Sequence, residues 1–61
     1  MPELEHLRIR WTDAIGEHFE LARAAWRITD GYEQDTFDGE ELELNYMRRL
    51  IAKFDELREM A

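Results

Sequence analysis

The stretch that decides the fold is residues 30–44, which read DGYEQDTFDGEELEL. Helix-type periodicity stops where this stretch begins and resumes before it ends. Glycine adopts the left-handed conformation at the end of a helix at little cost, so Gly31 is expected to terminate a first helix. The composition predicts a loop over about residues 31–37.

The same stretch carries signals for the start of a second helix at about residue 38. Asp38 is a favourable N-cap residue, and Glu41 three positions later has the spacing of a capping box. Phe37 and Leu42 flank the cap with the spacing of a hydrophobic staple. This second helix is expected to end at about residue 60 and carries a stripe of apolar residues: Leu44, Met47, Leu50, Ile51, Phe54 and Leu57.

Upstream, residues 2–30 are expected to form one long helix. Pro2 suits its first turn, and Gly16 in its middle is expected to allow another helix to approach closely. Apolar residues recur there in steps of three and four, which is helix periodicity and not the alternation of a strand. They are Leu4, Leu7, Trp11, Ile15, Phe19, Ala22 and Trp26.

Together these signals predict an all-α fold, a single domain over residues 1–61 built as an antiparallel hairpin of two helices. Sixty-one residues bury little core, and the chain has no cysteine for a disulfide. We therefore expect a homodimer in which two hairpins form a four-helix bundle. The residues expected to fill its core and dimer interface are Leu7, Trp11, Ile15, Phe19, Trp26, Met47, Ile51 and Phe54.

The net charge of −7 is concentrated between Asp30 and Glu43, which we call the acidic segment. It holds seven carboxylates and no Lys or Arg, whereas the rest of the chain has eight acids and eight bases. Such a surface can dock on a basic protein, with aromatic side chains as anchors. The residues expected to bind a partner are Asp30, Tyr32, Glu33, Asp35, Phe37, Glu40, Glu41 and Glu43.

These features favour a non-catalytic protein–protein interaction module, a small acidic adaptor or inhibitor. It would occupy a basic, possibly nucleic-acid-binding surface of a larger protein, as a phage-type inhibitor or DNA mimic does. One alternative is a structural dimerisation or assembly subunit that acts through its apolar stripe, with carboxylates that only solubilise and cap. The excess of acid argues against direct binding of nucleic acid or of anionic membranes.

The residue types in this sequence give little support for catalysis, for a cofactor site or for a metal site. The chain has no Ser or Cys nucleophile, and its three glycines are isolated, so no phosphate-binding loop is expected. A metal-binding bundle is a further alternative, because Glu3 and His6 have the i, i+3 spacing of such sites. Asp13, Glu17 and His18 form a second group, but the second helix has no His. The acidic N-terminus lacks an apolar core segment, so neither a signal peptide nor a membrane span is expected, and the predicted location is the cytoplasm.

Overall fold

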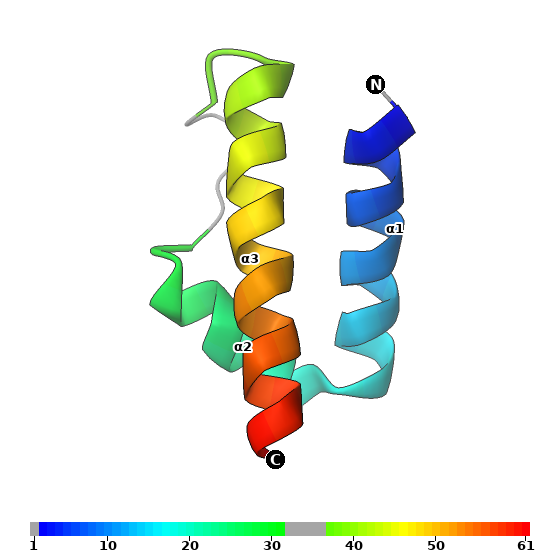
Figure 1. Ribbon diagram of the computed structural model, residues 1–61, viewed down its shortest axis with the longest axis vertical. Helices are drawn as coiled ribbons and strands as arrows, with labels where there is room; N and C mark the ends of the chain where they lie inside the picture. Colours follow the sequence, from blue (N-terminus) through cyan, green and yellow to red (C-terminus); the bar gives the residue numbers. More distant parts are fainter. Residues whose placement is uncertain (1, 32–36) are drawn as a thin grey trace.

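The computed structural model describes residues 2–31 and 37–61, and the regular structure within them is entirely α-helical. Helix α1 spans Pro2–Glu17, α2 spans Phe19–Ile28 and α3 spans Glu40–Met60. The three helices pack together as one bundle (Figure 1). The all-α class is confirmed. The two-helix hairpin is wrong, and with it the dimeric four-helix bundle that was to be built from two hairpins.

The predicted long helix is broken at His18, which has the non-helical angles φ −138° and ψ 60°. The break is one residue long, since the His18 amide still donates to the Ala14 carbonyl and the Ala22 amide donates to the His18 carbonyl. Gly16 lies two residues before it and lowers the local helix propensity. The expected close approach of another helix at Gly16 is wrong, because a Cβ atom there would meet nothing within 4 Å.

Because the chain reverses at this break, α1 and α3 run in the same direction and α2 runs against both (Figure 1). Side-chain contacts agree with this order. Arg48 of α3 pairs with Glu3 near the start of α1, and Asp55, two turns further along α3, pairs with Arg10, two turns further along α1. The antiparallel hairpin would have placed the start of the first helix beside the end of the last.

Helix α3 is the centre of the core. It supplies six of the buried apolar side chains, whereas α1 and α2 contribute Leu4 and three alanines. The small side chains of Ala14, Ala22 and Ala25 allow the two shorter helices to lie close to the large residues of α3. The buried apolar residues of α3 are Leu44, Tyr46, Met47, Leu50, Ile51 and Phe54.

Helix α2 ends in a Schellman motif. The Gly31 amide donates to the Trp26 carbonyl at 2.8 Å, and the Asp30 amide donates to the Arg27 carbonyl at 3.2 Å. Both Asp30 (φ 69°) and Gly31 (φ 77°) are left-handed. Helix α2 therefore ends at Ile28, two residues before the end expected at about residue 30, and Asp30 takes the first left-handed position in place of Gly31. The glycine is also needed for packing, because a Cβ atom there would lie 3.1 Å from the Trp26 ring.

The start of α3 differs from the predicted cap. Gly39 occupies the N-cap position with φ 153° and no side-chain hydrogen bond, so Asp38 lies one residue outside the helix. The capping box with Glu41 is therefore wrong by one position. Phe37 packs on Tyr46, with ring centroids 5.5 Å apart, while its predicted staple partner Leu42 is half exposed.

Candidate functional site

Three arginine–carboxylate pairs join α1 to α3. The Arg8 guanidinium donates to both Glu43 oxygens, at 2.9 and 2.5 Å, and Arg48 donates to both oxygens of Glu3, at 2.9 and 2.7 Å. Such paired hydrogen bonds fix direction as well as distance. The pairs therefore hold the two parallel helices in register.

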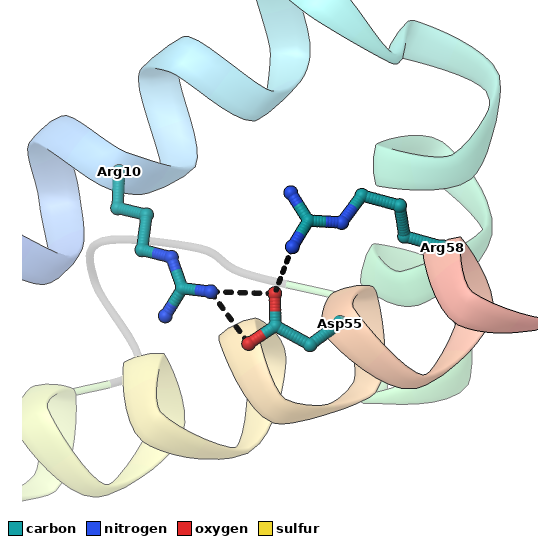
Figure 2. Close-up of polar contacts among 3 residues, drawn as sticks. All are labelled: Arg10, Asp55 and Arg58. Atoms are coloured by element: carbon teal, nitrogen blue, oxygen red, sulfur yellow. Dashed lines mark hydrogen bonds and ion pairs between the residues drawn. The ribbon is translucent and has the colours of Figure 1, made fainter.

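The third pair involves a shared carboxylate, shown in Figure 2. Arg10 Nη2 lies 2.6 Å from both oxygens of Asp55, and Arg58 Nη2 lies 3.7 Å from Asp55 Oδ1. The Arg58 guanidinium also lies over the Phe54 ring, 5.7 Å from its centroid. One carboxylate thus orients two arginines: Arg10 joins α1 to α3, whereas the contacts of Arg58 with Asp55 and Phe54 lie within α3.

The structure separates the predicted partner-binding residues into four groups. Asp30, Glu40 and Glu41 are exposed, as docking would require. Glu43 is buried and paired with Arg8, so its side chain is not on the exposed surface. Phe37 is partly buried against Tyr46. The others, Tyr32, Glu33 and Asp35, lie outside the described residues.

One consequence of the parallel arrangement is that the first turns of α1 and α3 lie at the same end of the bundle (Figure 1). Exposed carboxylates from both helices therefore lie at this end of the bundle. We call this surface the acidic end and define it by Glu5, Asp38, Glu40 and Glu41. Two positive helix termini favour acids at this position. Sequence reasoning missed Glu5, because its contribution depends on the direction of α1.

The predicted dimer and core residues also divide. Met47, Ile51 and Phe54 are buried, and Leu7 and Trp11 are partly buried against the same core. Trp11 meets Phe54 edge to face, with centroids 6.3 Å apart. These five side chains pack within one chain. The remaining three, Ile15, Phe19 and Trp26, stay exposed on the surface.

Two shallow hollows lie beside α1. The larger, of about 230 Å³, is lined by Trp11, Thr12, Met47 and Leu50, with the Arg8–Glu43 pair at its wall. The smaller, of about 150 Å³, is lined by Arg10, Asp13, Ala14, Glu17, His18, Phe54 and Arg58. Within residues 2–31 and 37–61, no three His, Asp or Glu side chains lie close enough to hold a metal ion. In the larger hollow, the Thr12 hydroxyl donates to the Arg8 carbonyl at 2.9 Å, and the Glu43 carboxylate accepts from the Arg8 guanidinium.

The fold shifts the pKa values of three groups: Glu3, Arg48 and Tyr46. Hydrogen bonds from Arg48 lower the pKa of Glu3 and raise that of Arg48 itself. Burial raises the pKa of Tyr46 above its usual 10.0, against a smaller opposing effect of its 3.1 Å hydrogen bond with Thr29. The Thr29 hydroxyl also donates to the Ala25 carbonyl, at 2.9 Å, so this buried cluster ties the end of α2 to α3.

Tyr46 should make the protein lose stability in alkali. Its raised pKa means that the folded chain holds the phenol proton more tightly than the unfolded chain. The stabilisation is complete below about pH 10 and is lost as the pH rises through the folded pKa. Urea unfolding at about pH 8 and about pH 11 should show a larger fall in unfolding free energy for wild type than for Tyr46→Phe. Equal falls in the two proteins would contradict this assignment.

Comparison with family models, with curated proteins and with solved structures found no match to this chain. None of the described helices is both long and apolar enough to cross a membrane. Function is therefore argued from the surface of the bundle alone.

Proposed function

We propose that this chain is a non-catalytic protein–protein interaction module whose acidic end docks on a basic surface of a larger protein. A surface that otherwise binds nucleic acid is the best fit. The observation that carries the proposal is the meeting of exposed carboxylates from α1 and α3 at one end of the bundle.

The charge distribution supports a directed surface. Three of the bases are already paired with acids: Arg8 with Glu43, Arg10 with Asp55 and Arg48 with Glu3. The acidic segment itself contains no Lys or Arg. The helix termini account for some of these acids, but a helix end carries only about half an elementary positive charge. An excess of negative charge therefore remains at the acidic end.

Such a surface would attract a protein that binds nucleic acid because the same electrostatic field draws both ligands. Double-stranded DNA carries one negative charge per about 1.7 Å of its axis. Carboxylates on two adjacent helix ends present a compact version of that field. Binding of this kind is fast and weakens as salt screens the charges.

The alternative function is an assembly subunit that acts through the apolar stripe. Less apolar surface is exposed for this function than the sequence predicts. Most of the stripe is occupied inside the bundle, and Ile15, Phe19 and Trp26 are what remains. This surface lies apart from the carboxylates of the acidic end, so the two hypotheses predict different sensitive residues.

A matched pair of charge reversals tests the proposal. Glu5→Lys with Glu41→Lys changes the acidic end, whereas Glu17→Lys with Glu59→Lys makes the same change in net charge near the C-terminal ends of α1 and α3. Glu43 is left intact because it pairs with Arg8. A partner captured from a lysate of the source organism should be retained by the control and lost, by about tenfold or more, with the acidic-end variant.

Two further readings sharpen this experiment. The captured partner should elute as salt is raised, and duplex DNA should compete for it. Far-UV circular dichroism establishes that both variants are folded. Equal capture by the two variants, or capture that salt does not weaken, would exclude the acidic end as the docking surface.

A further inference from the structure

The outward side of α2 carries a charge and aromatic pattern that the acidic end does not explain. We call this surface the α2 outer face and define it by Phe19, Glu20, Arg23, Trp26 and Arg27, all exposed. Residues seven apart lie two turns apart on one side of a helix. Phe19 and Trp26 therefore share one edge of the face, and Glu20 and Arg27 share the other.

The exposure of the two aromatic residues is costly. Phe19 is 58% exposed and Trp26 is 39% exposed, although both occur in a helix whose opposite side is fully packed on α3. Large aromatic side chains with incomplete burial are typical anchors of protein interfaces.

The charged residues of this face are Glu20, Arg23 and Arg27. None of them forms an ion pair within the part of the chain that the structure describes. Glu20 and Arg27 are about 10 Å apart along the helix axis, which is too far for a pair within α2. Their charges are thus available to a neighbouring molecule.

We propose that the occupant of the α2 outer face is a second copy of this chain, with the two α2 helices packed antiparallel. A two-fold axis that crosses α2 at Arg23 places Phe19 opposite the partner's Trp26, and Glu20 opposite the partner's Arg27. The aromatic edge of each copy then packs on the aromatic edge of the other. Two-fold symmetry makes the pairing of Glu20 with the partner's Arg27 occur twice. The face is self-complementary in this register.

Arg23 occupies the centre of this interface, where it meets its own symmetry mate. Its side chain is long enough to turn away from that repulsion, because the partner's Glu20 lies only one helical turn along the axis. Each Glu20 is then bracketed by Arg23 and Arg27 of the other copy. The arrangement leaves one cation in excess per chain, which suits a protein of net charge −7.

This dimer differs from a four-helix bundle formed by two hairpins. Each copy keeps Met47, Ile51 and Phe54 in its own core, and only a ten-residue helix makes the contact. So short a helix gives an interface below the roughly 1,200 Å² of standard complexes, and weak dimerisation follows. We expect a dissociation constant of about 10–100 μM.

A charge-swap cycle tests the register. Glu20→Arg and Arg27→Glu each place like charges opposite one another, and two-fold symmetry makes the change twice. Each single variant should dimerise about tenfold more weakly. The double variant restores opposite charges between positions 20 and 27 but leaves a cation beside the partner's Arg23, so it should dimerise more tightly than Glu20→Arg alone without reaching wild type. Sedimentation equilibrium from about 5 to about 500 μM, at an ionic strength of about 0.15 M, measures these constants.

The charge-swap cycle distinguishes an effect of the local pairing between the two α2 helices from an effect of the net charge of the chain. Glu20→Arg makes the chain two units less negative, so general repulsion between copies would predict tighter association, the opposite of our expectation. Ile28→Ser is the matched control, because this exposed residue lies about 200° around α2 from Trp26 and should leave dimerisation unchanged.

Circular dichroism confirms that each variant is folded before its association is compared. A chain that stays monomeric up to about 500 μM would overturn the proposal. Dimerisation that neither single swap weakens, or that adding Arg27→Glu to Glu20→Arg fails to tighten, would also overturn it, since another surface would then make the contact. The acidic end is untouched throughout, so failure here leaves the proposed docking function standing.

Discussion

Replacing Leu50 with alanine is expected to leave most of the chain unfolded at room temperature. Leu50 is 0% exposed and lies in the middle of α3, where it contacts the core shared by all three helices. A buried Leu→Ala change costs about 2–5 kcal/mol through lost burial and the cavity left behind. A domain this small has only about 3–5 kcal/mol of stability, so one such cavity removes most of it.

The matched control is Leu42→Ala, the same chemical change on the same helix. Leu42 is 51% exposed, and its substitution should alter the unfolding free energy by no more than about 0.5 kcal/mol. Urea titrations followed by circular dichroism compare the two. If Leu50→Ala costs no more than Leu42→Ala, then Leu50 is not part of a packed core and the helix arrangement described above is incorrect.

Removing Arg8 is expected to have the second largest effect. The Glu43 side chain is only 10% exposed, whereas that of Arg8 is 50% exposed. Arg8→Met therefore takes from a buried carboxylate its bidentate donor, whereas Glu43→Gln leaves a cation that can reach water. We expect a loss of about 2–4 kcal/mol for the first change and about half of that for the second.

A double variant tests whether the burial of Glu43 is the cause. Arg8→Met with Glu43→Met removes both charges and fills the site with apolar side chains, so it should be more stable than Arg8→Met alone. Wild type, Arg8→Met, Glu43→Met and the double variant form a four-member cycle whose coupling free energy measures the pair. Arg48→Met is a useful comparison because its partner Glu3 is half exposed, and the loss there should be clearly smaller. Equal losses at Arg8 and Arg48 would contradict this account.

Periodicity and turn chemistry predicted the helical class and the place where α2 ends. The apolar stripe over residues 44–57 identified five of the seven buried residues of α3, because a period of 3.6 fixes which side of a helix is apolar, and it did not include Tyr46 or Glu43. The end at Asp30 and Gly31 followed from the conformational freedom of glycine. Both signals are local, which is why a single sequence carries them.

The break at His18 could not be predicted in the same way. A single non-helical residue leaves the i, i+4 hydrogen bonds on either side almost intact, so apolar residues keep their spacing through it. Gly16 was the one local sign, and it fits a close helix approach equally well. The bend forms because folding back lets both α1 and α2 cover α3, a gain that depends on residues 20 to 40 positions away.

In the candidate surfaces, too, some features follow from the local sequence and others only from the tertiary structure. The concentration of carboxylates between Asp30 and Glu43 is plain from composition, but Glu43 belongs to the core because Arg8 lies opposite it in space. Glu5 belongs to the acidic end only because α1 and α3 are parallel. The α2 outer face exists because the break turns Phe19 and Trp26 away from the core they were expected to fill.

By itself the sequence determined that this protein is helical, where most of its helix ends lie and where its charge is concentrated. Each of these properties depends on a residue and its neighbours within one or two helical turns. Only the tertiary structure decided the number of helices, their directions, and which acids and aromatics remain exposed. Those outcomes depend on whether the free energy gained by burying the apolar side of α3 exceeds the free energy lost by breaking the helix at His18. Both quantities depend on contacts across the whole chain.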